Sequence, residues 1–238
     1  MKKIVSIWLW FTGGLFFLFS SLILVVCLFL FSKKTTFQIA RFLFTVLIRI
    51  MGIKLFVTGR ENIGSEKTYL IMGNHQSLFD IFVVPVAIPL CFVGVEAAYH
   101  FKVPVWGYLI RKWGCIPIQR DNLKSAVSSL ETARKRLLSG VSIAILPEGH
   151  RTLTGEIASF KKGPFHLAKG AKADILPFAI TGLFDYHQKG DLIINPGEVQ
   201  VNIGRPIPYD EFKDLSIEEL RQSVFDLISN LNKKTSKY

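Results

Sequence analysis

The hydrophobic residues of this 238-residue chain follow two different patterns. From Ile4 to Phe31 the sequence is almost entirely apolar and contains no charged residue. An uncharged stretch of more than about 18 residues is long enough to cross a bilayer. Beyond residue 60, short apolar runs alternate with amphipathic segments, as is typical of a folded domain. The pattern therefore predicts a membrane-anchoring segment over residues 1–60, with an apolar helix over 4–31, and a globular domain over residues 61–238.

Residues 37–52 are predicted to form a second, amphipathic helix. Arg41, Thr45 and Arg49 are spaced by four positions and share one helical face, and the other positions are mostly apolar. Such a helix can lie at the membrane interface, with its arginines directed at lipid headgroups or at the protein. A two-helix membrane hairpin with snorkelling arginines fits the same pattern. Both arrangements remain open.

The remaining chain alternates between predicted strands and helices. Six short apolar runs predict strands over residues 68–73, 91–95, 115–118, 141–146, 175–181 and 198–203. Helical periodicity predicts helices over 123–138, which Gly140 ends, and over 216–231, which Ser216 and Glu219 start as a capping box. Continuous apolar strands are typical of sheets covered on both faces. We therefore expect an α/β fold with a central, mostly buried sheet flanked by helices, an N-terminal membrane helix and a second amphipathic or membrane helix.

The distribution of charged residues along the chain indicates that its N-terminal part binds membranes. The chain carries a net charge of +11, and residues 1–60 hold eight Lys and Arg and no acidic residue, against 21 basic and 18 acidic residues in the remainder. A basic excess beside an apolar segment favours anionic lipids. The folded domain lacks the clustered basic residues and interleaved aromatics of a nucleic-acid-binding surface, so we expect no nucleic-acid partner.

The number and spacing of the cysteines indicate the cellular compartment of the domain. Three of them are scattered at positions 27, 91 and 115, without the spacing of metal ligands or of a disulfide framework. We therefore expect no metal site and a globular domain in the reducing cytosol. The predicted localisation is the inner or cytoplasmic membrane or its equivalent, with this domain on the cytosolic side.

Candidate chemistry is concentrated in residues 74–80, directly after the first predicted strand. In one regular helix, five steps of about 100° would place His75 and Asp80 on different faces. The two side chains can meet if His75 lies in the loop before a helix and Asp80 lies in its first turn. Ser77 followed by Asp80 is a capping-box-like start signal, with Ser77 as the N-cap. An imidazole steered by a carboxylate can accept a proton from an alcohol near neutral pH. The alternative is that Asp80 only caps the helix and His75 is an ordinary loop residue.

Two further loops carry polar residues after apolar strands, over residues 114–120 and 147–152. In sheets with helices on their faces, ligands bind in the loops beyond the strand ends. All three loops can therefore converge on one site.

In this order and spacing, the loops resemble the glycerolipid acyltransferase family, of the lysophosphatidic acid acyltransferase type. Its NHxSxxD block is matched by Asn74, His75, Ser77 and Asp80. Its Gly-x-Ile-x-Ile-x-Arg block is matched by Gly114, Ile116, Ile118 and Arg120. Its Pro-Glu-Gly-Thr-Arg-Ser block is matched by Pro147, Glu148, Gly149 and Arg151. Its proline-containing apolar strand is matched by residues 176–180. The similarity covers roughly residues 68–182, and an N-terminal membrane segment is usual in the family.

Two departures from the family pattern stand out. His150 replaces the usual threonine and Thr152 the usual serine of the third block. The stretch between Val95 and Phe101 lacks the lysine pair often seen after the second strand. Substrate contacts in that stretch therefore cannot be carried over from the family.

The resemblance implies transfer of a fatty acyl group from an acyl thioester to the sn-2 hydroxyl of 1-acylglycerol 3-phosphate. In this scheme His75 is the general base, Asp80 orients it, and no covalent acyl-enzyme forms. Guanidinium groups suit phosphate oxygens. The implied phosphate- and glycerol-binding residues are Arg120, Glu148, Gly149 and Arg151. Further candidates are Asn74, Lys161 and Lys162.

The resemblance also implies the partners. We expect membrane lipids, lysophosphatidic acid, and acyl-CoA or acyl carrier protein as co-substrate, with no separate cofactor. Within the enzyme class, the acceptor could instead be another lysolipid or glycerol 3-phosphate. A membrane lipid-binding relative that kept the fold and lost the chemistry is the alternative from a different class.

Overall fold

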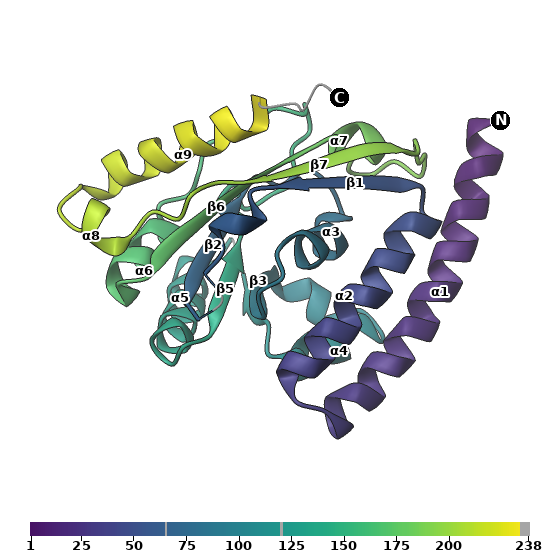
Figure 1. Cartoon of the computed structure of the whole chain (residues 1–238), viewed down its shortest axis with the longest axis horizontal. Helices are drawn as coiled ribbons and strands as arrows, with labels where there is room; N and C mark the ends of the chain where they lie inside the picture. Colours follow the sequence, from purple (N-terminus) through teal and green to yellow (C-terminus); the bar gives the residue numbers. More distant parts are fainter. Residues whose placement is uncertain (65, 120, 234–238) are drawn as a thin grey trace.

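The computed structural model describes residues 1–64, 66–119 and 121–233. Its centre is a seven-stranded sheet with the order β1-β7-β6-β2-β5-β3-β4 (Figure 1). The strands are β1 (Ile53–Thr58), β2 (Tyr69–Gly73), β3 (Phe92–Ala97), β4 (Ile116–Ile118), β5 (Ser142–Ile145), β6 (Asp174–Thr181) and β7 (Gly197–Ile203). Neighbouring strands pair in parallel except β6 and β7, which are antiparallel.

Helices cover both faces of the sheet (Figure 1). Those on one side are α1 (Lys2–Leu30), α2 (Lys33–Ile50), α3 (Asp80–Ala87) and α4 (Trp106–Trp113). Those on the other side are α5 (Leu123–Leu138), α6 (Gly163–Ala171) and α9 (Ile217–Lys233). Short helical turns complete the chain as η1 (Arg60–Asn62), η2 (Ala98–Lys102), α7 (Leu183–Tyr186) and α8 (Tyr209–Phe212). This architecture confirms the predicted α/β fold.

Strand β2 shows how the sheet separates two cores. Side chains of a strand alternate between the two faces. Ile71 therefore joins the apolar cluster beneath α1, α2 and α3, whereas Leu70 and Met72 join the cluster beneath α5, α6 and α9. All five residues of β2 are buried, which explains why the strand is a continuous apolar run.

The six predicted strands are all present, with shifts of one or two residues at their ends. The helix over 123–138 matches α5, and the Ser216–Glu219 capping box starts α9 through two reciprocal hydrogen bonds. Strand β1 was not predicted. The division of the chain at residue 60 stays a prediction.

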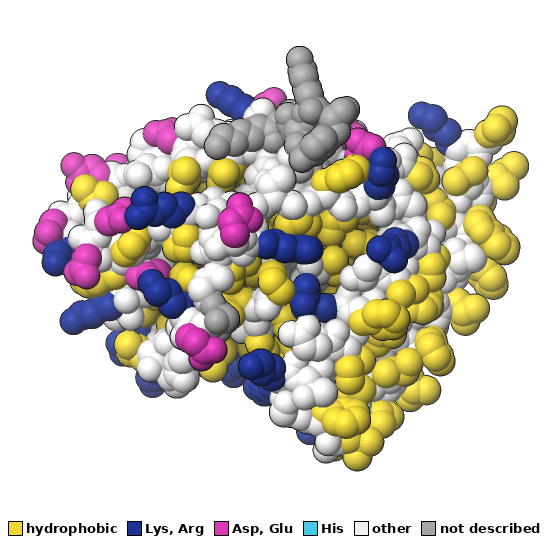
Figure 2. Space-filling view, in the orientation of Figure 1, with side chains coloured by type: hydrophobic (Ala, Val, Ile, Leu, Met, Phe, Trp, Pro, Cys, Tyr) yellow, Lys and Arg dark blue, Asp and Glu magenta, His cyan; other side chains and the backbone are white. Residues whose placement is uncertain are grey.

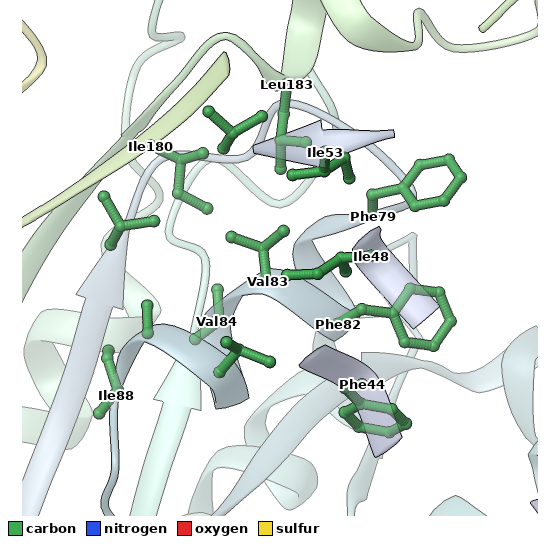
Figure 3. Close-up of a cluster of buried hydrophobic side chains, with 14 of the residues drawn as sticks. Phe44, Ile48, Ile53, Phe79, Phe82, Val83, Val84, Ile88, Ile180 and Leu183 are labelled. Atoms are coloured by element: carbon green, nitrogen blue, oxygen red, sulfur yellow. The ribbon is translucent and has the colours of Figure 1, made fainter. Parts of the chain in front are cut away.

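The two N-terminal helices form an antiparallel hairpin, and α2 lies between α1 and the domain (Figure 1). Helix α2 starts at Lys33 rather than 37, because the hydroxyl of Ser32 accepts a hydrogen bond from the amide of Thr35 and caps the first turn. Its inner face packs on α3, where the rings of Phe44 and Phe82 lie 5.2 Å apart (Figure 3).

Helix α1 presents a broad apolar surface (Figure 2). Its most apolar 18-residue window has a mean hydropathy of 2.6, and within the described part of the chain it alone is long and apolar enough to cross a membrane. Large side chains along it remain more than half exposed, among them Phe11, Leu15, Leu22 and Phe29. Such a surface is costly in water, and it indicates membrane association.

Candidate active site

The segment after β2 is fixed by its own side chains. The amide group of Asn74 bonds the backbone of β6 twice: its nitrogen donates to the carbonyl of Ile180 at 2.9 Å, and its oxygen accepts from the amide of Ile180 at 2.7 Å. Asn74 thereby imitates a strand pair at the point where β2 ends. This explains its burial and places the next residue, His75, at the carboxyl edge of the sheet.

The structure brings His75 and Asp80 together. Nδ1 of His75 lies 2.5 Å from Oδ2 of Asp80, and their side chains are 15% and 2% exposed. The carboxylate also accepts hydrogen bonds from the backbone amides of Gln76, at 3.0 Å, and Ser77, at 3.2 Å. An ionised Asp80 holds the proton on Nδ1, so Nε2 is the nitrogen able to accept another. The arrangement can act as a general base.

The predicted cap of α3 is wrong in one respect. The helix begins at Asp80, after Phe79, and Ser77 gives it no side-chain cap. The hydroxyl of Ser77 instead donates to the carbonyl oxygen of His187 at 2.9 Å. The reverse half of the capping box is present, because Asp80 accepts from the amide of Ser77.

Glu148 braces the two loops that carry the motifs. One carboxylate oxygen accepts from the amide of His75 at 2.6 Å, and the other accepts from the amide of Ala158 at 2.7 Å. The amide of Thr152 completes the contact by donating to the carbonyl of His75. Burial raises the pKa of Glu148 to about 7, although both amide bonds oppose this shift. Its role toward a ligand stays a prediction.

The remaining candidates are placed unequally. Gly149 has a φ of +77°, a conformation that glycine adopts without strain. Arg151 is half-buried near His187: burial lowers the pKa of His187, and the charge of Arg151 acts in the same direction. Lys161 is exposed close to Gly149, whereas Lys162 pairs with Glu218 of α9. Arg120 lies outside the described residues.

His75 and Asp80 stand at an apolar cavity of about 200 Å³ between the helical hairpin and the sheet. Helices α1 to α4 supply most of its wall, including Leu28, Phe37, Phe44 and Trp113. Glu96 and His100 add a second hydrogen-bonded pair to the lining, at 2.8 Å. Glu148, Gly149, Arg151, Lys161 and Lys162 are not among the lining residues. The cavity is therefore suited to an aliphatic chain, and His75 is part of its lining.

Three residues that were not predicted, Gln76, His187 and Trp10, support the loop that carries His75 and Asp80. The side-chain oxygen of Gln76 accepts from the amides of Leu183 and Phe184, at 3.0 and 3.3 Å. The buried ring of His187 packs edge-on against Phe79 and against Trp10 of α1. Gln76 lies inside the NHxSxxD block and could have been considered from the sequence. His187 and Trp10 are distant in the chain and gave no local signal.

Comparisons with known proteins support the fold and give the family. The family model described as "Acyltransferase" matches residues 54–181, which is more than half of the chain. The chain therefore belongs to the acyltransferase family.

Individual relatives carry more detailed names. The chain is 30% identical over 173 residues to the 1-acyl-sn-glycerol-3-phosphate acyltransferase BAT2, chloroplastic, of Brassica napus, covering 72% of this chain and 50% of the relative. It is 29% identical to the 1-acyl-sn-glycerol-3-phosphate acyltransferase of Borreliella burgdorferi, covering 82% and 78%. The crystal structure of the 1-acyl-sn-glycerophosphate (LPA) acyltransferase, PlsC, from Thermotoga maritima superimposes with a TM-score of 0.86 at 23% identity, over 100% and 98% of the two chains. That likeness shows the fold alone. Against several of the curated relatives it matches, the chain spans about half their length.

Proposed function

We propose that this protein transfers a fatty acyl group from an acyl thioester to the sn-2 hydroxyl of 1-acylglycerol 3-phosphate, giving phosphatidic acid. The observation that carries the proposal is the His75–Asp80 pair, held at 2.5 Å at the edge of an apolar cavity. The names of the relatives support the choice of acceptor.

His75 acts on the acceptor alcohol. Nε2 takes the proton of the sn-2 hydroxyl as its oxygen attacks the thioester carbonyl. Asp80 stabilises the imidazolium that forms. The carbon–sulfur bond then breaks, and the leaving thiolate takes the proton from the imidazolium, so His75 ends the cycle neutral.

The attack is direct, without an acyl-enzyme. Ser77, the hydroxyl nearest in sequence to His75, is buried and donates its proton to the carbonyl of His187. Cys115 lines the cavity, but burial raises the pKa of its thiol to about 12, so it stays protonated at neutral pH. Neither side chain is an activated nucleophile, and the substrate alcohol takes this role.

Attachment to the membrane gives the protein access to its lipid substrate. Acceptor and product both carry acyl chains, and moving a chain into water costs about 0.8 kcal/mol for each CH₂ group. With α1 in the bilayer, its neighbouring cavity can receive a chain from the lipid. The domain lies on the cytosolic side of the inner or cytoplasmic membrane, where the co-substrate is acyl-CoA or acyl carrier protein. Arg151, and Arg120 by resemblance, bind the acceptor phosphate together with Glu148 and Gly149.

The test is acyl transfer by the purified protein in lipid vesicles. Labelled acyl-CoA and acyl carrier protein are each offered with lysophosphatidic acid, glycerol 3-phosphate, lysophosphatidylcholine or a lyso-aminolipid. We expect labelled phosphatidic acid from lysophosphatidic acid, and loss of at least about 10²-fold in rate for His75→Ala. His166→Ala, at an exposed position of α6, is the matched control.

Two outcomes would overturn the proposal. Faster transfer to another acceptor would show that the proposed acceptor is wrong, although the type of reaction would stand. No transfer to any acceptor, with intact lipid binding, would favour a lipid-binding relative without catalysis.

A further inference from the structure

A second hollow lies on a different face of α2 from the apolar cavity. It is bounded by α2, by strand β1 and by the end of α3, and it shares no lining residue with the cavity at His75. Four basic side chains line it, and no acidic residue does: Arg41, Arg49, Lys54 and Arg60. We call this hollow the arginine groove. Figure 2 shows basic side chains gathered in this part of the surface, beside the apolar face of the helical hairpin.

Two of the arginines are held in place by the end of α3. Arg41 donates from Nε to the carbonyl of Pro85 at 3.0 Å, and Arg60 donates from Nε to the carbonyl of Ala87 at 3.0 Å. Both also donate to the carbonyl of Val86, at 3.4 and 3.1 Å. Carbonyls at a helix C-terminus have no partner within the helix and attract cations. Both guanidinium groups are therefore fixed before any ligand arrives.

The three arginines of the groove have no carboxylate partner within the described residues. Within the part of the chain that the structure describes, Arg41, Arg49 and Arg60 form no ion pair, and Arg49 also forms no side-chain hydrogen bond. Lys54 does pair with Glu198, at 2.9 Å, across an exposed surface. Burial and the neighbouring charge of Arg60 lower the pKa of Arg41. An anion placed between the guanidinium groups would relieve this repulsion.

Strand β1 adds backbone donors to the same wall. It is one of the two edge strands of the sheet, and its strand pairing within the described residues is with β7 alone. An edge strand leaves a row of amide and carbonyl groups without ladder partners. Ile53, Lys54, Leu55 and Val57 of this strand line the groove. The groove thus combines fixed guanidinium groups, which suit phosphate oxygens, with the open edge of a strand.

We propose that the arginine groove binds the phosphate of a membrane lipid with a phosphomonoester headgroup, at a site separate from the catalytic pair. The groove opens beside α2, which packs against α1, the helix with the exposed apolar surface. A lipid can therefore place its chains along the hairpin while its phosphate reaches the arginines. A phosphomonoester carries up to two negative charges and three exposed oxygens. This matches three arginines that form no ion pair within the described residues better than a shielded phosphodiester does. The proposal does not rest on the acyl-transfer function.

The test measures lipid retention by the full-length protein in detergent micelles, using native mass spectrometry. The probes are dioctanoyl phosphatidic acid, dioctanoyl phosphatidylcholine and inorganic phosphate. Arg49→Gln removes the arginine that makes no structural hydrogen bond, and Lys34→Gln removes an exposed charge of α2 outside the groove. We expect Arg49→Gln to weaken phosphatidic acid binding by about tenfold, the effect of one charge-assisted contact, and Lys34→Gln to leave it unchanged.

Each other outcome counts against the proposal. Equal effects of the two substitutions would mean general charge attraction without a site. Equal retention of phosphatidylcholine would remove the selectivity for a phosphomonoester. Inorganic phosphate binding as tightly as the lipid would assign the groove to soluble phosphates. If Arg49→Gln unfolded the protein, Lys54→Gln, at an exposed position of β1, would have to reproduce the loss of affinity.

Discussion

The two sides of α2 form two sites of opposite character. Phe37, Ala40 and Phe44 line the apolar cavity that leads to His75, whereas Arg41 and Arg49 line the arginine groove. The cavity is lined by apolar side chains apart from a few polar ones, which include the His75–Asp80 and Glu96–His100 pairs. The groove gathers three arginines that form no ion pair with a carboxylate of the described chain. A single amphipathic helix thus separates a place for acyl chains from a place for anions. The amphipathic pattern of α2 therefore separates two hollows from each other, in addition to separating the core from solvent.

The largest effect is expected on the cavity side, at Asp80. Asp80→Asn keeps the size of the side chain but cannot hold the proton on Nδ1 of His75 as a carboxylate does. We expect the rate of acyl transfer to fall by about 10³-fold with the fold intact. Asp226→Asn, on the exposed face of α9, is the control. A loss below tenfold would remove Asp80 from the chemistry and leave it as a loop brace.

The cavity wall should set acyl-chain preference. A methyl group at Gly94 would meet no atom closer than 3.6 Å, so Gly94→Ala should be tolerated, whereas Gly94→Leu would fill part of the cavity. Each excluded CH₂ group forfeits about 0.8 kcal/mol, so we expect about a tenfold shift in kcat/KM toward shorter chains for Gly94→Leu. Competition between short and long acyl donors measures the shift. Equal loss with every chain length would mean that the chain does not occupy this cavity.

A smaller effect is expected where α1 meets the catalytic loop. The indole N–H of Trp10 donates to the carbonyl of Leu192 at 2.8 Å, and its ring lies 5.9 Å from Phe79. Losing this aromatic contact costs ~1 kcal/mol, so Trp10→Ala should lower kcat about fivefold with little change in KM. Trp8→Ala, which removes an exposed indole of the same helix, should not. Equal effects of both changes would indicate that α1 acts only as an anchor.

The smallest effect concerns stability and pH. Burial raises the pKa of Glu148 to about 7, so between pH 4.5 and 7 the folded protein binds more protons at this group than the unfolded chain does. Stability should therefore fall as pH rises through this window. The melting temperature in detergent should decrease by a few degrees over that range. Glu148→Gln should remove this decrease, and Glu156→Gln, exposed in the same loop, should keep it.

The sequence predicts the interior of the sheet well, because buried strands such as β2 are uniformly apolar and bounded by loops. It did not predict β1, since Lys54 interrupts the apolar pattern and the partner strand lies 144 positions away. The failed Ser77 cap has a similar cause: a tertiary contact with His187 takes the hydroxyl. Local patterns also place Arg41 and Arg49 on one face of α2, but periodicity cannot say what that face meets. The structure directs Arg41 at the protein, toward the end of α3.

The position of β1 constrains how the protein can be assembled. This strand directly follows the helical hairpin in the chain, yet its only strand partner among the described residues is β7. During synthesis the hairpin can enter the bilayer long before residues 197–203 exist to complete the sheet. Because strands so distant in the chain pair slowly, β1 has no strand partner on either edge until β7 has been synthesised and has docked. The positive charges of Lys54 and of the arginines around it disfavour pairing of this exposed edge with a strand of another chain.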